Sequence, residues 1–421
     1  MKNAAENLAK IIQCQTVSVS NGDDYSAFAQ IHTLLQKLYP NVFSVMNFTK
    51  INDYSIILRW SSSQKSAKPV LYCAHLDVVP AGEGWTKSPF GGEICNGKIY
   101  GRGALDMKNT LACLLESAES LITTGFTPRQ DIYFAFGHDE ELGGFNGAAN
   151  VAKYFAENNI KFEMILDELG FISTENDRKI ARIGVSEKGI SNFTLTARDD
   201  GGHASTPAQS TALGRLSEAI VRIEKNQPPI KLTPLAKDYF SAICPEINLE
   251  NADELQKLSQ NAMHNALLRT TAATTIMKGG HRHNVLPKIA TANVNVRLLQ
   301  GTTSDEYYEF LQDLISDLDI EITARKMKEA IKVSDYKSEI YKKFSGIVKD
   351  FFADAIPVPH LMTGSTDSSF YENLSENIYR FCPFELEKGQ YETIHAADEY
   401  VRVDSLQTAI EFYKSVMKTE W

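Results

Sequence analysis

The sequence predicts an α/β protein with a mostly parallel, doubly wound sheet and a smaller α+β domain inserted into it. In the first part of the chain, apolar strand patterns alternate with helical patterns, as in consecutive βαβ units. Near Gly184 the strands begin to alternate apolar and polar residues, which is typical of a sheet with one exposed face. These two observations together indicate the fold class.

The first part of the chain supplies its elements in the order that a parallel sheet requires. Apolar strands are predicted at residues 69–75, 131–137 and 162–166. Asp106 opens an apolar stripe that ends at Gly125 and predicts a helix, and NGAANVAKYFAEN predicts a second helix. The resulting β-α-β-α-β order is that of a doubly wound sheet.

The insert has a different pattern. Residues 192–198 and 291–299 alternate as half-exposed strands, and residues 211–225 form an amphipathic helical pattern. The helix-strand pattern of the first part resumes after about residue 302. We therefore expect one domain from residues 1–183 and 302–421, and an insert of ordinary domain size at 184–301.

Composition excludes some classes of function. The 421 residues suffice for two or three domains, and the net charge of −10 argues against a nucleic-acid-binding surface. No run of 18 apolar residues is present, so we expect no membrane-spanning helix, and the first twenty residues resemble an amphipathic helix rather than a signal peptide. The six cysteines are scattered without a CxxC pair, which favours a cytoplasmic location.

Acidic residues and a histidine follow the predicted strands. His75 ends one strand, Glu140 and Glu141 follow the next, Asp167 ends a third, and Asp106 precedes a helix. Ligands of open parallel sheets bind beyond the carboxyl ends of the strands. Carboxylates gathered there repel one another unless they are protonated or neutralised by cations. Imidazole and carboxylate ligands together suit zinc, manganese or cobalt.

Each of these residues also has an ordinary structural explanation. Asp106 is a natural helix N-cap, and Glu140-Glu141 could be a solvated acidic turn. His75 and Asp77 point to one face of their strand, where the carboxylate could hold one ring nitrogen, or both could be loop residues. The joint placement favours a metal site. If Glu141 binds metal, Glu140 is left beside a metal-bound water, which indicates hydrolysis.

Several motifs resemble a known family. HLDVVP (75–80), GRGALDMKN (101–109), GHDEELGG (137–144) and LDELG (166–170) resemble the di-zinc metallopeptidases, which include aminoacylase, carboxypeptidase G, acetylornithine deacetylase and succinyl-diaminopimelate desuccinylase. GGHASTP (201–207) and residues 267–287 resemble the branch of carboxypeptidase S and the N-fatty-acyl-amino-acid hydrolases. STDSSFY (365–371) and YETIHAADEYV (391–401) continue the resemblance to the end of the chain.

The resemblance implies two zinc ions per chain, with cobalt or manganese as substitutes. It implies that His75 and Asp167 bind one ion and that Glu141 and His395 bind the other. Asp106 would bridge the two ions, and the peptide bond after it would be cis.

The resemblance also implies roles around the metal site. Glu140 would be the general base, and Asp77 would orient the metal-binding histidine. His203 would stabilise the oxyanion, commonly in the active site of the partner subunit; its alternative is an exposed loop residue.

The substrate carboxylate would be bound by Arg297 and Asn284, with the backbone at Gly364 facing it. Arg297 could instead be a surface arginine on an alternating strand. The sequence departs from the family at Glu168-Leu169-Gly170, where Glu-Gly-Gly is usual, and at GSTD, where GGTD is common.

The activity implied is hydrolysis of the amide bond of N-acyl amino acids, dipeptides or N-blocked peptides with a free C-terminal carboxylate. Two alternatives stay open: a dedicated biosynthetic deacylase of the acetylornithine or succinyl-diaminopimelate type, and a non-catalytic amino-acid-binding protein on the same scaffold. We expect a homodimer through the insert, and no nucleic-acid or membrane partner.

Overall fold

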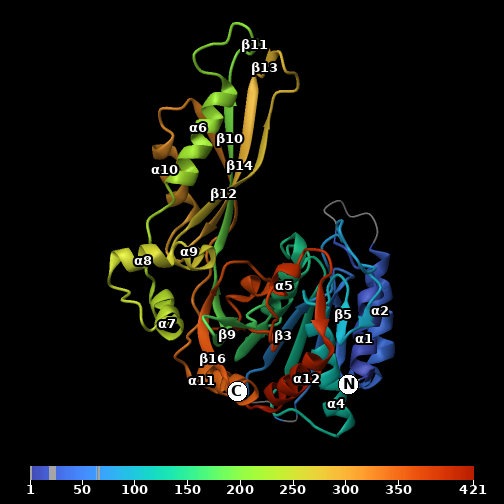
Figure 1. Cartoon of the computed structure of the whole chain (residues 1–421). Coiled ribbons are helices and arrows are strands. Elements are labelled where there is room, and N and C mark those ends of the chain that lie inside the picture. Colours follow the sequence, from blue (N-terminus) through green and yellow to red (C-terminus); the bar gives the residue numbers. More distant parts are fainter. Residues whose placement is uncertain (1, 19–24, 63, 65–66) are drawn as a thin grey trace. The chain divides into compact units, whose positions relative to one another are not determined.

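The computed structural model describes residues 2–18, 25–62, 64 and 67–421, which form two compact units (Figure 1). Unit 1 comprises Met1–Val185, Ser334–His360 and Thr366–Trp421. Unit 2 comprises Ser186–Val333 and Leu361–Ser365. Each unit has its own sheet and is described separately.

Unit 1 is built on a nine-stranded sheet with the order β1-β2-β6-β3-β7-β17-β9-β16, in which β8 pairs with β9. The strands β6, β3, β7 and β17 are parallel, and β2 and β9 pair antiparallel to this centre. The strands are β1 (Asn47–Ile51), β2 (Ser55–Trp60), β3 (Val70–His75), β6 (Ile132–Gly137), β7 (Met164–Asp167), β8 (Ile172–Glu175), β9 (Arg178–Glu187), β16 (Ala355–Met362) and β17 (Ile378–Arg380). The predicted α/β class is confirmed.

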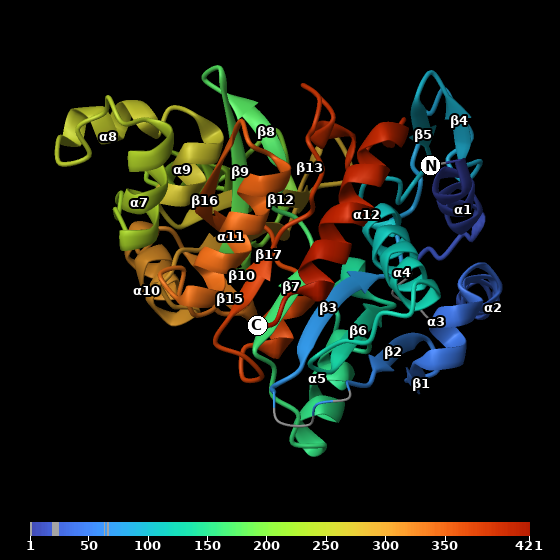
Figure 2. The same cartoon turned by 90° about the horizontal axis from the view of Figure 1, so that it is seen from below.

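Helices on both faces explain why β3 and β6 are buried along their whole length. Leu71 and Cys73 of β3 pack with Val151 and Phe155 of α5. The alternate residues of β3 point to the opposite face, where α4 packs beside α12 (Figure 2). The helices are α1 (Lys2–Gln13), α2 (Ser26–Leu38), α3 (Pro40–Val45), α4 (Lys108–Thr123), α5 (Ala148–Glu157), α11 (Glu339–Phe351) and α12 (Val403–Lys418).

A small sheet joins two distant segments of unit 1. Its strands are β4 (Glu93–Cys95), β5 (Lys98–Tyr100) and β18 (Tyr400–Arg402), in the order β18-β5-β4. The pairing of β5 with β18 continues into a hydrogen bond from the Gly101 N–H to the Glu399 carbonyl oxygen. The loop after β5 and the loop before β18 are therefore held side by side.

Unit 2 contains an antiparallel sheet with the order β12-β14-β10-β15. Leu216 of α6 and Leu311 of α10 lie in a core with the inward residues of β10 and β14, such as Phe193 and Val294. The elements are β10 (Gly189–Arg198), β11 (Gly202–His203), α6 (Ala212–Lys225), α7 (Pro234–Ile243), α8 (Ala252–Leu258), α9 (Ala262–Leu268), β12 (Thr271–Gly279), β13 (Val285–Leu286), β14 (Ile289–Leu298), α10 (Ser304–Leu314) and β15 (Ile320–Lys328).

The insert is longer than the sequence predicted. It begins at Ser186, close to the expected residue 184, but extends to Val333 instead of residue 301. The reason is the pairing of β15 with β10 from Ile320 to Lys328, which completes the sheet of the insert. The first helix and the first strand after residue 302, α10 and β15, therefore belong to the insert.

Two expectations from composition can be compared with the structure. No helix among the described residues is long and apolar enough to cross a membrane. All six cysteines are free thiols, and Cys73 and Cys113 are buried as expected from their apolar surroundings.

Candidate metal centre

Three ligand-type side chains meet where β3 and β7 end. His75 is the last residue of β3, Glu168 follows β7, and Asp106 lies in the loop before α4. His75 Nε2 lies 3.2 Å from Asp106 Oδ1 and 3.5 Å from Glu168 Oε2. All three residues are less than a tenth exposed. The three ligand atoms lie within 4.8 Å of one another, which is close enough to share one cation.

A second set shares Asp106 with the first. His395 Nε2 lies 3.3 Å from Asp106 Oδ2 and 3.1 Å from Glu141 Oε2. The two oxygens of Asp106 thus face one histidine each, which is the arrangement of a carboxylate that bridges two cations. The peptide bond from Asp106 to Met107 is cis, as the resemblance implied.

The structure places one predicted ligand, Asp167, outside the candidate metal-binding groups. Asp167 ends β7, and its Oδ2 accepts a hydrogen bond from the Ser368 N–H at 2.8 Å. Leu169 and Gly170 both have positive φ, so the chain turns sharply after the strand. It is Glu168, rather than Asp167, whose carboxylate approaches His75 and Asp106.

Asp77 connects the histidine to the glutamate pair. Its carbonyl oxygen lies 2.9 Å from His75 Nδ1, and its carboxylate lies 3.5 Å from the same nitrogen. The carboxylate oxygens accept hydrogen bonds from the backbone N–H groups of Glu140 and Glu141, at 3.2 and 3.1 Å. Asp77 therefore positions η1 (Glu140–Leu142) as well as the imidazole.

Glu140 belongs to neither of the two sets that contain Asp106. It lies with His75 and Glu141, so its carboxylate is at the site without being required as a shared ligand. Burial, and then the charge of Glu168, raises the pKa of Glu140 well above its ordinary value. A carboxylate with a raised pKa is a better proton acceptor, as a general base must be.

The electrostatics of the cluster call for cations. Burial raises the pKa of both Glu141 and Glu168, because their charges are removed from water and lie close to other carboxylates. Hydrogen bonds to Asp106 and then Glu141 raise the pKa of His395 to about 10. The mixture of imidazole and carboxylate donors fits divalent cations of the zinc, manganese and cobalt group, which would neutralise the carboxylates in place of protons.

Sequence reasoning missed the residue that fixes Asp106. The Glu399 carboxylate accepts hydrogen bonds from the backbone N–H groups of Gly103, Leu105 and Asp106, at 2.8 to 3.1 Å. It also pairs with Arg102 at 2.6 Å, with both side chains fully buried. The only sequence signal was a Glu four residues after His395, in a stretch that reads as a polar loop.

Unit 2 carries the other predicted site residues, and it separates them into two groups. His203 and Asn284 lie at one end, where the Ala204 N–H donates to the Asn284 carbonyl oxygen and both residues line a cavity of about 700 Å³. The Ser205 N–H donates to His203 Nδ1 at 3.2 Å, so the proton of the neutral ring lies on Nε2.

Arg297 lies at the opposite end of the sheet from His203. Arg297 follows Ile289, which lines the His203 cavity, by eight positions along β14, about 27 Å at the rise of an extended strand. In the sheet, Arg297 of β14 lies opposite Ile190 of β10, and Ile190 lies opposite Lys328 of β15. The Nζ of Lys328 lies 3.4 Å from Ser365 Oγ. The structure thus brings Arg297 towards the Gly364 loop, whereas Asn284 of the same chain lies with His203 at the other end of the sheet.

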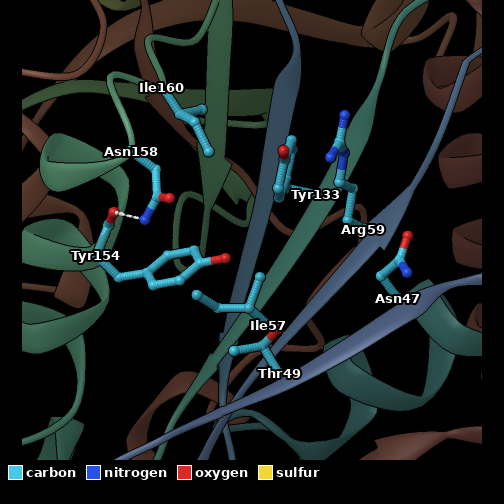
Figure 3. Close-up of a pocket in the computed structure, with 8 residues that line it drawn as sticks. All are labelled: Asn47, Thr49, Ile57, Arg59, Tyr133, Tyr154, Asn158 and Ile160. Atoms are coloured by element: carbon cyan, nitrogen blue, oxygen red, sulfur yellow. Dashed lines mark hydrogen bonds between the residues drawn. The ribbon is translucent and has the colours of Figure 1, made fainter.

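A separate cavity in unit 1 offers no comparable chemistry. It measures about 370 Å³ and lies between β1, β2, β6 and the end of α5, lined by Tyr133, Tyr154 and Asn158 among others (Figure 3). Its one cation, Arg59, already pairs with Asp131 at 2.7 Å. None of the metal-centre residues lines it.

A mostly parallel sheet with a two-centre cluster of carboxylates and histidines at its strand ends fits the class of metal-dependent hydrolases. Comparison with known proteins identifies the group within that class. The chain belongs to the peptidase family M20/M25/M40, whose model matches residues 71–419.

The comparisons extend over almost the whole chain. A probable carboxypeptidase S-like protein 2 of Dictyostelium discoideum is 34% identical over 98% of this chain and 84% of its own length. The human N-fatty-acyl-amino acid synthase/hydrolase PM20D1 is 33% identical over 97% of this chain and 86% of its own. Among solved structures, the metallo-carboxypeptidase Sso-CP2 of Sulfolobus solfataricus has a TM-score of 0.74 at 17% identity, covering 99% of both chains. Human carnosine dipeptidase 1 has a TM-score of 0.71 at 14% identity, covering 99% of this chain and 95% of its own.

Proposed function

We propose that this enzyme hydrolyses the amide bond of N-acyl amino acids or short peptides that have a free C-terminal carboxylate. The observation that carries the proposal is the pair of ligand sets sharing Asp106, with Glu140 beside them. The carboxypeptidase S-like and N-fatty-acyl-amino acid relatives support this class of substrate.

Two zinc ions per chain are the proposed cofactors, with cobalt or manganese as substitutes. His75, Asp106 and Glu168 would hold one ion, and Asp106, Glu141 and His395 the other. When bound, the ions supply Lewis acidity towards the amide carbonyl and lower the pKa of a water molecule.

The protein's own residues would carry the proton and the substrate. The Glu140 carboxylate would accept the proton of the attacking water and return it to the leaving amine nitrogen. His203 would donate its Nε2 proton to the oxyanion, and the two terminal nitrogens of Arg297 would pair with the substrate carboxylate. The backbone at Gly364 would lie against the same carboxylate.

A homodimer through the insert is part of the proposal. His203 and Arg297 lie too far apart within one chain to hold the same small substrate, which supports a composite site in which His203 comes from the partner. Asn284, beside His203, would enter the active site with it. The free cysteines agree with a cytoplasmic location.

The proposal is tested by measuring free amino acid release from dipeptides, N-acetyl amino acids, N-long-acyl amino acids, acetylornithine and succinyl-diaminopimelate. The assay would be run with zinc, with a chelator, and after zinc is restored. We expect release that the chelator abolishes and zinc recovers. Release from acetylornithine or succinyl-diaminopimelate alone would favour the dedicated deacylase, and binding without release would favour the binding protein.

A further inference from the structure

The face of the unit 2 sheet opposite its hydrophobic core carries a row of half-buried polar side chains. Along β14, Val294 and Val296 point into the hydrophobic core, and the alternate residues point to the other face. This second set contains Asn293, Asn295 and Arg297 in succession.

Hydrogen bonds connect the row into one network. Arg297 Nε donates to Asn295 Oδ1 at 3.2 Å, and Asn295 Nδ2 donates to Asn192 Oδ1 at 3.0 Å. Asn192 lies directly opposite Asn295 on β10 and also accepts from Asn293 Nδ2 at 3.2 Å. Because both ends of the Asn295 amide are engaged, its oxygen is fixed towards Arg297.

Two cations at this end of the sheet, Arg297 and Lys188, have only neutral hydrogen-bond partners among the described residues. Arg297 has no ion-pair partner among the residues that the structure describes. Lys188 is 2% exposed, and its Nζ donates to the carbonyl oxygens of Ala266 and Arg269 and to the Thr271 hydroxyl, which are all neutral. Thr271 lies opposite Arg297 on β12.

Lys188 is buried and Arg297 is half-buried, so neither cation is fully hydrated. Burial lowers the pKa of Arg297, and burial followed by the charge of Arg297 lowers the pKa of Lys188 to about 7. Buried charge without a partner is costly, so this end of the sheet is suited to an anionic ligand.

We propose that Asn295 is a positioning residue that makes Arg297 selective for a carboxylate over a neutral carboxamide. A neutral acceptor at Nε fixes the plane of the guanidinium, leaves both terminal nitrogens to the ligand, and does not neutralise the charge. An aspartate in the same place would form an ion pair with Arg297 and compete with the substrate. The inference rests on the proposed function, in which Arg297 binds the substrate carboxylate.

The test compares Asn295→Asp and Asn295→Ala with Asn293→Ala, a matched control in the same network that does not touch Arg297. The probes are glycyl-leucine and N-lauroyl-leucine, each with its C-terminal amide. For the better carboxylate substrate, we expect Asn295→Asp to raise KM about tenfold or more, with kcat changed less than about twofold. Asn295→Ala should raise KM by a smaller factor, and in both variants the preference for carboxylate over amide should fall.

The Arg297→Met variant distinguishes the role proposed for Arg297 from the role proposed for Asn295. If Arg297→Met raises KM but neither Asn295 variant does, the inference is overturned while the role of Arg297 stands. If Asn293→Ala raises KM as much as Asn295→Ala, the network has only a structural role and the inference is also overturned. If Arg297→Met leaves KM unchanged, the proposed carboxylate site fails, and the inference fails with it.

Discussion

The Glu399 carboxylate accepts a hydrogen bond from the backbone N–H of Asp106, at 3.0 Å, in the interior of unit 1. Through this contact the loop that carries His395 supports the loop that carries Asp106. The other oxygen of Glu399 forms an ion pair with Arg102. Arg102 also donates a hydrogen bond to the Ala396 carbonyl oxygen. The loops that carry Asp106 and His395 are therefore fixed by one buried ion pair.

Loss of this pair should destabilise the protein strongly. Glu399→Ala leaves the buried Arg102 charge and three backbone N–H groups unpaired, and we expect the free energy of unfolding to fall by about 3–5 kcal/mol. Urea unfolding measures the change. Glu420→Ala is the control, because Glu420 pairs with Arg129 on the surface and its loss should cost at most about 1 kcal/mol. Equal effects of the two substitutions would contradict the structural role of Glu399.

Metal content should distinguish Glu168 from Asp167. We expect Glu168→Ala to bind about one metal ion fewer per chain than the wild type, because its carboxylate completes the set with His75 and Asp106. Asp167→Ala should keep both ions and lose mainly stability, since Asp167 accepts a hydrogen bond from Ser368. Metal analysis after dialysis provides the measurement, and the reverse pattern would restore Asp167 as the ligand.

Metal binding should release a proton from His395. The pKa of His395 is raised to about 10 in the metal-free protein, so its imidazole is protonated at pH 7–8 and must lose this proton to bind a cation. Apparent metal affinity should therefore increase as the pH rises towards 10. Calorimetric titration in two buffers of different ionisation enthalpy measures the proton released, and binding heats that do not depend on the buffer would argue against this linkage.

The same shift affects the metal-free protein. The pKa of His395 is higher in the folded state than its ordinary value of 6.5, so its contribution to stability is complete below pH 6.5. The contribution is lost as the pH rises through about 10. In thermal unfolding with a chelator present, the melting temperature should fall as the pH rises over this range. The fall should be smaller in the His395→Asn variant.

A composite active site predicts complementation between two inactive variants. In a mixed dimer of Glu140→Ala and His203→Ala chains, one site combines an intact Glu140 with an intact His203 from the partner. Random mixing should therefore restore about a quarter of the wild-type rate. Activity assays before and after subunit exchange test this, with each variant alone as the control. No recovery, despite demonstrated exchange, would place His203 in its own chain's site.

The sequence predicted those parts of the site that depend on apolar strand patterns and on the polar residues that follow them. The apolar strands ending at His75 and before Glu140 appear as β3 and β6, with their ends adjacent in the parallel sheet. Strand periodicity could not choose between Asp167 and Glu168, because the sharp turn after β7 decides which of the two adjacent carboxylates returns to the site.

Other features depend on tertiary pairing that no local pattern reveals. The true end of the insert depends on β15 joining β10, strands separated by more than a hundred residues. Glu399 and Asn295 resemble ordinary polar residues of a loop and an alternating strand. Their roles appear only when the Asp106 loop and Arg297 are placed beside them.

The most direct test of the account is turnover by Glu140→Gln measured together with its metal content. We predict that the variant binds as much metal as the wild type, because Glu140 lies outside both sets that share Asp106. Amino acid release should fall at least about 100-fold, the loss expected when a general base is removed. Unchanged release at unchanged metal content would contradict the assignment of Glu140 as the base.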